Sequence, residues 1–211
     1  MTIRAVFFDL GRVLVHFDHM QACSKFASMA NNQLSAERVF KLLYGGDIED
    51  GYERGRTDAW FAGEVRRALT LPHVSQSDIV TIWGDVFSPI EEVDALVGEV
   101  RAAMPVLGII SNTTAPHWEW IKKCIPRALE HIPRANRVLS FEAKARKPEQ
   151  AIYRSAIERA GCDPQEMLFI DDKKENLAGA EACGIQTLAF DARSESISDL
   201  RIKLRARGVL T

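Results

Sequence analysis

The sequence predicts an α/β protein with a doubly wound parallel sheet and a small helical-bundle cap inserted after the first strand. Two observations predict this class. Short, continuous apolar runs, typical of strands buried on both faces, alternate with longer amphipathic stretches over most of the chain. Over residues 17–88 the alternation stops and the pattern is helical. We therefore expect a discontinuous core domain over 1–16 and 89–211, with a cap domain over 17–88.

The first predicted strand covers residues 5–8 (AVFF) and leads directly into Asp9. A glycine, Gly11, follows two positions later and provides for a tight turn. Parallel sheets of this kind bind ligands at the carboxyl ends of their strands. We therefore expect the carboxylate of Asp9 to point into a functional site.

The insert contains four predicted helices, over 20–31, 36–43, 58–69 and 78–87. The stretch from Ser75 to Asp78 resembles a capping box and indicates the start of the last of these helices. Gly45, Gly46 and Pro72 interrupt the helical pattern between them. The insert therefore predicts a bundle, and not a continuation of the sheet.

After the insert, predicted helices and strands alternate to the end of the chain. Ser88 and Pro89 are predicted to open a helix that runs to about residue 104. Further strands are predicted over 106–110, 136–140, 167–170 and 185–190. Further helices are predicted over 116–124, 148–160, 177–183 and 194–207, with a loop over 141–146. This alternation predicts the parallel sheet.

Composition excludes several classes of partner. Lys and Arg number 27 against 29 Asp and Glu, and the net charge of −2 argues against nucleic acid or an anionic membrane. The four cysteines are scattered without metal-site spacing and indicate reduced thiols. Met1 leaves no room for a signal peptide before the first strand, and no apolar run approaches the ~20 residues of a membrane span. We expect a cytoplasmic monomer or homodimer that binds a small molecule.

Polar side chains follow the main core strands, where a parallel sheet would gather them: Asp9, Ser111, Asn112, Asp171 and Asp172. Lys147 comes just before a predicted helix, whose N-terminus favours anions. Carboxylates suit Mg²⁺, which takes one or two of them together with water and substrate phosphate. A hydroxyl and an ammonium group suit the remaining phosphate oxygens. The sequence therefore predicts a site for magnesium and a phosphoryl group.

These four segments resemble the motifs of the haloacid dehalogenase superfamily. The matching stretches are 8–14 (FDLGRVL), 110–113 (ISNT), 146–148 (RKP) and 169–172 (FIDD), and the resemblance extends over essentially the whole chain. It implies a Rossmann-like core with a C1-type cap. The first motif is most similar to that of bacterial sugar-phosphate phosphatases such as α-glucose-1-phosphate phosphatase.

The resemblance implies a Mg²⁺-dependent phosphatase that acts on a small phosphorylated metabolite of the sugar phosphate class. Asp9 would attack phosphorus and become an aspartyl phosphate, with Ser111 and Lys147 as the other catalytic residues. The implied metal ligands are Asp9, the carbonyl of Gly11, Asp171 and Asp172.

One position departs from the family pattern. Most phosphatases of the superfamily carry a second aspartate two residues after the nucleophile, where it protonates the leaving oxygen and activates water, a role worth about 10²–10⁴-fold. Here that position is Gly11. Either the leaving group needs little protonation, as in a glycosyl or acyl phosphate, or another residue supplies the proton. The candidates for that residue are His16, Asp18, Glu53, Arg54 and Arg56.

We expect five residues to contact the substrate: Asn112, Arg12, His16, Glu53 and Arg54. Arg12 replaces an asparagine of the nearest relatives, and Lys144 replaces a glycine before the lysine motif. These two additional cations suggest the hypothesis that the substrate is more anionic than a neutral-sugar monophosphate.

Three alternatives remain open at this point. A 2-haloacid dehalogenase shares the aspartate nucleophile, the Ser-Asn pair and the Lys-Pro pair, but it needs no metal, so the pair Asp171 and Asp172 favours phosphoryl transfer. A weakly active relative that binds phosphorylated ligands would explain the absence of the usual acid. A phosphotransferase would pass the phosphoryl group to an acceptor other than water.

Overall fold

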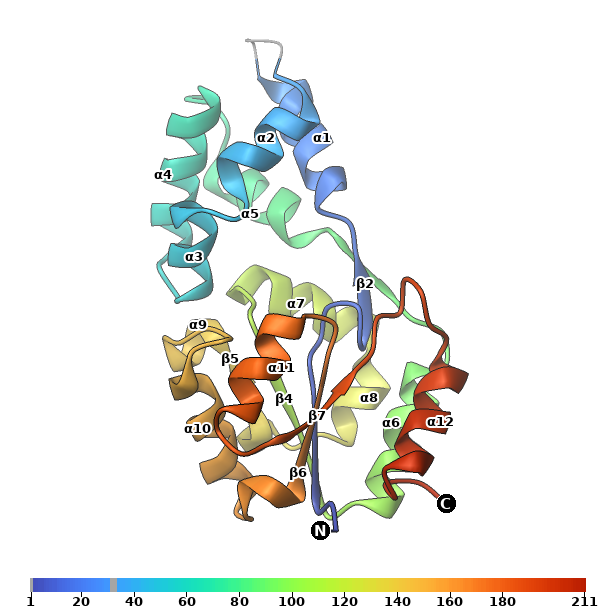
Figure 1. Cartoon of the computed structure of the whole chain (residues 1–211). Helices are drawn as coiled ribbons and strands as arrows, with labels where there is room; N and C mark the ends of the chain where they lie inside the picture. The colour runs from blue at the N-terminus through green and yellow to red at the C-terminus, as the bar shows by residue number, and fades with distance from the viewer. Residues whose placement is uncertain (1, 31–33) are drawn as a thin grey trace.

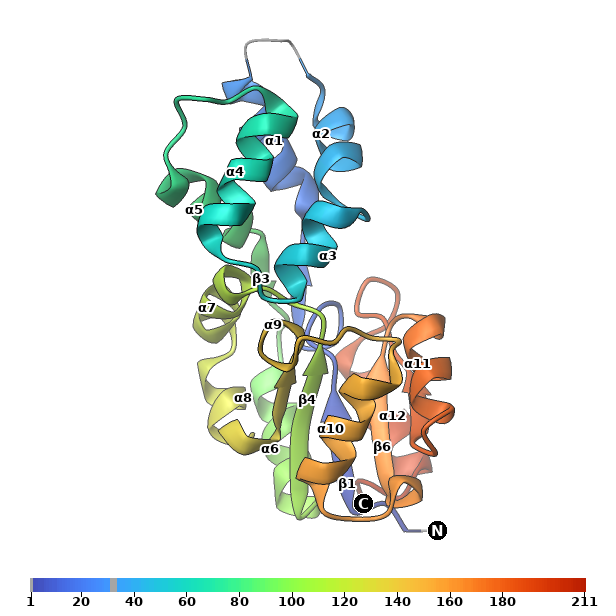
Figure 2. The same cartoon turned by 90° about the vertical axis from the view of Figure 1, so that its left-hand side faces the viewer.

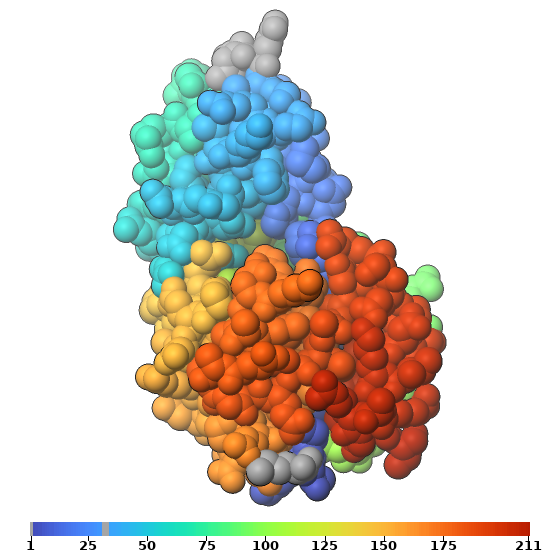
Figure 3. All heavy atoms as spheres, viewed as in Figure 1, coloured from blue at the N-terminus to red at the C-terminus, as the bar shows by residue number. Residues whose placement is uncertain are grey.

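The computed structural model describes residues 2–30 and 34–211, which form two lobes joined at a narrower waist (Figures 1 and 3). The lower lobe in Figure 1 contains the sheet, and the upper lobe is helical. Both chain termini lie at the end of the lower lobe that faces away from the helical lobe (Figure 1). No helix within the described ranges is both long and apolar enough to cross a membrane.

The sheet of the lower lobe has five parallel strands in the order β5-β4-β1-β6-β7. Their bounds are Ala5–Phe8 (β1), Val106–Ser111 (β4), Arg137–Leu139 (β5), Met167–Asp171 (β6) and Gln186–Ala189 (β7). β1 lies in the centre, where Phe8 pairs with Ile109 on one side and with Ile170 on the other. Every residue of β1 is buried, as its unbroken apolar run predicts.

Helices cover both faces of the sheet, which confirms the predicted doubly wound α/β fold (Figures 1 and 2). One face packs against α6 (Val93–Ala103), α7 (Ala115–Cys124), α8 (Pro126–Glu130) and α12 (Ile197–Ala206). The other packs against α10 (Gln150–Ala160) and α11 (Lys174–Glu181). Short helical segments complete the lobe: η1 (Arg134–Asn136), α9 (Ser140–Ala143) and η2 (Pro164–Glu166).

The described residues of the upper lobe form five helices between two short strands. The helices are α1 (His19–Met29), α2 (Ala36–Leu43), α3 (Asp47–Glu53), α4 (Asp58–Leu69) and α5 (Gln76–Gly84). They enclose a hydrophobic cluster of their own around Phe26, Phe61 and Trp83. The strands β2 (Val15–Phe17) and β3 (Phe87–Pro89) pair antiparallel and carry the chain into and out of this lobe. On these grounds we propose residues 17–88 as the cap.

Side-chain caps explain where most cap helices start. Asp18, Ser35, Thr57 and Ser75 each accept a hydrogen bond from a backbone N–H in the first turn of α1, α2, α4 and α5, respectively. Each of these residues satisfies a donor that a helix start would otherwise leave without a partner. Half of the capping box predicted from Ser75 and Asp78 is present: the Ser75 hydroxyl accepts from the backbone N–H of Asp78, but Asp78 accepts from that hydroxyl and not from the Ser75 backbone.

Several predicted boundaries were wrong. Ser88 and Pro89 belong to β3, and the helix that they were predicted to open starts at Val93. The predicted helix over 78–87 ends at Gly84, and α3 was not predicted. The stretch 141–146, predicted as a loop, includes most of α9. Asn31, the predicted end of the first cap helix, lies outside the described residues.

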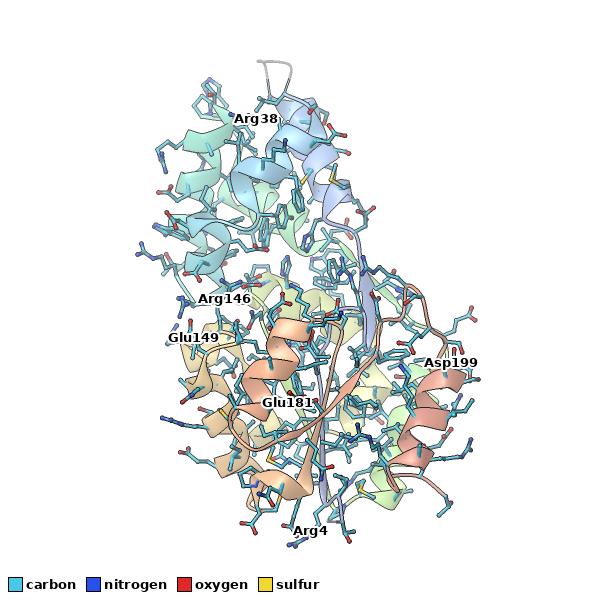
Figure 4. All side chains as sticks on the ribbon, viewed as in Figure 1. Arg4, Arg38, Arg146, Glu149, Glu181 and Asp199 are labelled. Atoms are coloured by element: carbon cyan, nitrogen blue, oxygen red, sulfur yellow. The ribbon has the colours of Figure 1, made fainter. Side chains whose placement is uncertain are left out.

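Ion pairs join α3 of the cap to the segment 144–149 of the core. Arg54 pairs with Glu149, and Arg146 pairs with Asp50 at 2.6 Å. Lys144 donates a hydrogen bond to the carbonyl of Gly55 at 3.2 Å. Arg146 and Glu149 lie where the two lobes meet (Figure 4). We call this set of contacts the cap–core clamp.

Gly108 in β4 leaves room for a ring of the neighbouring strand, and its replacement by alanine is expected to destabilise the protein. A Cβ atom at Gly108 would overlap the ring of Phe7, its partner in β1. We expect Gly108→Ala to lower the free energy of unfolding by about 1–3 kcal/mol, measured by urea denaturation. The control is Gly63→Ala in α4, where the new Cβ meets nothing within 4 Å and a gain of up to ~1 kcal/mol is expected. Equal stability of Gly108→Ala and the wild type would show that the Phe7 ring moves aside freely.

Candidate active site

The parallel register brings the polar residues at the ends of three strands together. Asp9 follows β1 directly, and its backbone N–H donates to the carbonyl of Ile170 in β6 at 2.8 Å. Ser111 is the last residue of β4, and Asp171 is the last residue of β6. Because β4 and β6 flank β1, these side chains meet at one edge of the sheet, as predicted.

Lys147 lies at the centre of this group. Its Nζ is 2.8 Å from Oδ1 of Asp9 and 2.6 Å from Oδ2 of Asp171, and its side chain is only 1% exposed. Asn112 holds the lysine backbone from both sides, because its Oδ1 accepts from Lys147 N at 2.8 Å and its Nδ2 donates to Lys147 O at 3.0 Å. Asn112 therefore lines the site, as expected, and also positions the lysine.

Asp171 is fully buried, and both of its oxygens already have partners. Oδ1 accepts hydrogen bonds from the backbone N–H of Lys173 and from Asn176, and Oδ2 accepts from Lys147 and Asn176. Among the described residues that line the adjacent cavity, Asp172 is present and Asp171 is not. Asp171 therefore holds the ammonium group of Lys147 beside Asp9.

Burial and crowding change the proton affinities of these groups. The pKa of Asp9 is raised to about 6, because its burial and the carboxylates of Asp171 and Asp172 outweigh the attraction of Lys147. Burial also raises the pKa of Asp172, although Arg12 opposes this effect with its Nη1 3.1 Å from Oδ2. Burial lowers the pKa of Lys147, but the two carboxylates beside it outweigh that effect and the pKa is raised. Burial thus raises the pKa of both Asp9 and Asp172 despite the cations beside them.

The acidic residues of the site fit a divalent cation. Asp9, Asp171 and Asp172 each offer a carboxylate oxygen, and these oxygens lie within 4.8 Å of one another. Carboxylate oxygens are hard ligands of the kind that Mg²⁺ prefers. Lys147 pairs with Asp9 and Asp171, and Arg12 pairs with Asp172, which Lys173 also attracts; a bound cation would add positive charge among these three carboxylates.

A cavity opens in front of these residues, between the core and the cap. It is small, with about 110 Å³ available to the centres of water-sized molecules. The core contributes the catalytic candidates, and the cap and its connecting strands contribute a mixed aromatic and ionisable wall. The lining includes Asp9, Gly11, Ser111, Asn112, Lys147 and Asp172 from the core, and Phe17, His19, Glu49, Glu53 and Phe87 from the cap side.

The structure brings only some of the predicted substrate contacts into this cavity. Glu53 and Asn112 line it, whereas Arg12, His16 and Arg54 are not among its described lining residues. Arg12 pairs with Asp172, and Arg54 pairs with Glu149 and Asp50 in the cap–core clamp. His16 lies in β2 opposite Ser88.

The added cations do not support the hypothesis of a more anionic substrate. The guanidinium of Arg12 is held by Asp172, and Lys144 donates to the carbonyl of Gly55. Neither side chain lines the cavity among the described residues. Both positive charges therefore serve contacts within the protein.

Several lining residues were not predicted as site residues, and the ionisable ones among them are His19, Glu49, His117, Arg146 and Lys173. Burial lowers the pKa of His19 to about 4 and that of His117 to about 3, so both rings are neutral near pH 7. Nε2 of His117 lies 3.0 Å from the carbonyl oxygen of Trp83. Arg146 directly precedes the lysine of the third motif, and this proximity was the one available signal for it.

The sheet gathers carboxylates and a lysine at its carboxyl edge, where they face the helical lobe. This arrangement is that of a doubly wound α/β enzyme. The chain belongs to the haloacid dehalogenase-like (HAD) hydrolases, because the model of that hydrolase family matches residues 3–184. This result confirms the resemblance seen in the sequence.

Comparison with individual proteins finds similarity to a phosphatase, to a HAD family enzyme and to a dehalogenase. The chain is 24% identical over 202 residues to a glyceraldehyde 3-phosphate phosphatase of Methanothermobacter thermautotrophicus, covering 90% of this chain and 86% of that protein. It is 30% identical to a HAD family enzyme of Bacteroides thetaiotaomicron solved in complex with magnesium and inorganic phosphate, with a TM-score of 0.79, covering 94% of this chain and 98% of that one. It shares the fold of an L-2-haloacid dehalogenase of Xanthobacter autotrophicus at 16% identity and a TM-score of 0.64, covering 100% of this chain and 85% of that one.

Proposed function

We propose that this protein is a Mg²⁺-dependent phosphatase that hydrolyses a small phosphorylated metabolite of the sugar phosphate class. The observation that carries the proposal is the position of Asp9. Its carboxylate lies at the end of the central strand, 2.8 Å from Nζ of Lys147, in a cavity shared with Ser111 and Asp172. A nucleophile, phosphate-binding groups and a metal-binding acid thus face the same small space.

Each of these residues has a role in the proposed reaction. Asp9 attacks phosphorus and carries the phosphoryl group as an aspartyl phosphate. Lys147 and the hydroxyl of Ser111 bind the phosphoryl oxygens. The Ser111 hydroxyl is available for this role, because the hydrogen bond that it donates to the carbonyl oxygen of Asn112 is long, at 3.5 Å.

Asp9, Asp172 and the carbonyl of Gly11 would hold Mg²⁺, with Asp171 close enough to contribute. The ion would supply charge stabilisation to the phosphoryl group as it is transferred. Two relatives support this assignment: one is a phosphatase, and the other was solved with magnesium and inorganic phosphate.

The cap wall supports a hydroxylated substrate. Glu49, Glu53 and His19 face the cavity, and the two carboxylates offer acceptors for the hydroxyl groups of a sugar phosphate. The small size of the cavity favours a substrate of few atoms. We therefore place the substrate among small sugar phosphates, including glycosyl phosphates.

Metal removal is expected to abolish the activity. The test measures phosphate release from sugar phosphates, acyl phosphates and p-nitrophenyl phosphate, with Mg²⁺ or with EDTA. We expect turnover with Mg²⁺ and a loss of about 10²–10⁴-fold with EDTA, since the ion contributes several kcal/mol of charge stabilisation. Asp172→Asn should weaken Mg²⁺ binding measured by calorimetry, whereas Asp47→Asn at the exposed start of α3 should leave it unchanged. Metal-independent release of halide from 2-haloacids would contradict the proposal.

A further inference from the structure

The space that an acidic side chain at position 11 would need is filled. A Cβ atom at Gly11 would lie 2.8 Å from Cε1 of Phe17, closer than such contacts occur. The ring of Phe17 is itself held in place, because it stacks on His19 with centroids 4.6 Å apart and Arg12 lies over it at 4.7 Å. The Phe17 ring therefore excludes the usual proton carrier from this position, and a leaving oxygen that needs a proton has to take it from another wall of the cavity.

Four carboxylates line the cavity among the described residues: Asp9, Asp172, Glu49 and Glu53. Asp9 and Asp172 already have roles as nucleophile and metal ligand. Glu49 accepts a hydrogen bond from the backbone N–H of Gly45 at 2.7 Å, which ties it to the start of α3. Glu53 is thus the cavity carboxyl that is left for proton transfer.

Glu53 is buried, and one of its oxygens has no hydrogen-bond donor within the described part of the chain. The residue is 8% exposed, at the end of α3. Oε2 is held in an ion pair 2.6 Å from Nε of Arg146, but the two atoms are poorly aligned for a hydrogen bond, so neither has a well-aligned partner among the described residues. A buried carboxyl oxygen of this kind gains free energy from a polar group that enters the cavity to meet it.

The charges around Glu53 come from three elements. Arg146 faces it from the core segment that carries Lys147, Glu49 from the preceding turn of α3, and Lys173 from the segment after β6. Burial is the largest effect, and it raises the pKa of Glu53 to about 7 despite Arg146. A group with this pKa exchanges its proton readily near neutral pH. The two histidines of the cavity are poor substitutes, since both are already neutral.

We propose that Glu53, reaching from the cap into the cavity, carries the proton that position 11 cannot carry; this inference rests on the proposed phosphatase activity. In the first step the Asp9 carboxylate bonds to phosphorus, the bond from phosphorus to the leaving oxygen breaks, and that oxygen takes the Glu53 proton to leave as an alcohol. In the second step a water oxygen attacks phosphorus and gives a proton to the Glu53 carboxylate. Inorganic phosphate leaves, and Asp9 and Glu53 return to their starting states.

The test compares Glu53→Gln with the wild type on two substrates, an alkyl phosphate and p-nitrophenyl phosphate, with saturating Mg²⁺. We expect kcat/KM for the alkyl phosphate to fall about 10²–10⁴-fold, because its leaving oxygen needs a proton. We expect kcat/KM for p-nitrophenyl phosphate to fall much less, because p-nitrophenolate leaves without one. With that substrate the variant should release a burst of p-nitrophenolate equal to the enzyme concentration, because water attack on the aspartyl phosphate becomes slow.

The pH profile gives a second readout that a purely structural role would not change. For the wild type, kcat/KM on the alkyl phosphate should fall above about pH 7 as Glu53 loses its proton. Glu53→Gln should lack this alkaline limb. Added formate should partly restore the activity of Glu53→Ala, since it can enter the space and supply a carboxyl group.

Asp50→Asn is the matched control, because Asp50 also pairs with Arg146 but is not among the described lining residues of the cavity. It should change the rates on both substrates by the same factor. If Glu53→Gln also lowers kcat/KM for both substrates equally, or lowers neither value, Glu53 carries no proton and the inference is wrong. If the wild type releases no phosphate in a Mg²⁺-dependent manner from any compound, the proposed function itself fails.

Discussion

Asp9→Asn is expected to abolish phosphate release while leaving a folded protein. An amide cannot form the aspartyl phosphate, and we expect kcat to fall by about 10⁴-fold or more, as is common when a hydrolase loses its nucleophile. The side chain keeps its shape, and Lys147 keeps Asp171 as a partner at 2.6 Å. The measurement is phosphate release with Mg²⁺, combined with mass spectrometry of the enzyme after rapid quenching. The wild type should gain the mass of one phosphoryl group, and the variant should not.

The control for this prediction is Asp47→Asn, which removes a carboxylate from an exposed position at the start of α3. It should retain the activity of the wild type. Substantial turnover by Asp9→Asn, or a phosphoryl group on another residue of the variant, would show that the nucleophile lies elsewhere.

Lys147→Met is expected to produce the largest loss of stability among single changes in the site. The lysine side chain is 1% exposed and its Nζ lies within 2.8 Å of two buried carboxylates, so its removal takes away the cation that both of them contact. Breaking a buried ion pair in this way typically costs about 3–5 kcal/mol. The measurement is urea denaturation in EDTA, so that a bound cation does not replace the lost charge.

The loss should increase with pH. Lys147 lowers the pKa of Asp9, so its removal raises that pKa further in the folded state, above the value in the unfolded chain. The folded variant then binds more protons than the unfolded chain, and its stability falls as pH rises through this range. The stability of the variant should therefore be closer to that of the wild type at pH 5 than at pH 8.

The control is Lys144→Met, an exposed change three residues away, which should shift the free energy of unfolding by less than about 1 kcal/mol at either pH. Wild-type stability of Lys147→Met at pH 8 would contradict the view that Lys147 is needed to hold these two carboxylates together.

The core could be predicted from the sequence because its signals are local. An apolar run such as 5–8 followed by Asp9 indicates a buried strand and the residue at its end. The carboxyl ends of parallel strands lie at the same edge of the sheet, so the residues that follow them are expected to meet. The short ribbon of β2 and β3 has no such signal, because three residues are too few to show a period. Helix α3 was missed because it is short, acidic and contains Gly51, so that little helical pattern is visible in it.

The cap side of the site could be predicted only in part, because it depends on how the two lobes meet. Glu53 was among the candidates, but Arg54 next to it was expected at the substrate and instead pairs with Glu149 across the lobes. His19 and His117 come from α1 and α7, which are distant in sequence, and no local pattern indicates that both face one cavity. The role of Phe17 in filling the space beside Gly11 likewise becomes visible only in three dimensions.

The antiparallel ribbon of β2 and β3 has a consequence for how this family member could acquire new substrates. His16 and Ser88 are paired, so the chain leaves the core and returns to it at neighbouring points, and the insert behaves as one long hairpin loop. Closing a loop depends only weakly on its length, so a whole insert can be exchanged without rebuilding the sheet. An exchange of this kind would normally alter substrate preference alone. Here, on the role proposed for Glu53, the same exchange would also remove the proton carrier, so recognition and chemistry must evolve together in this insert.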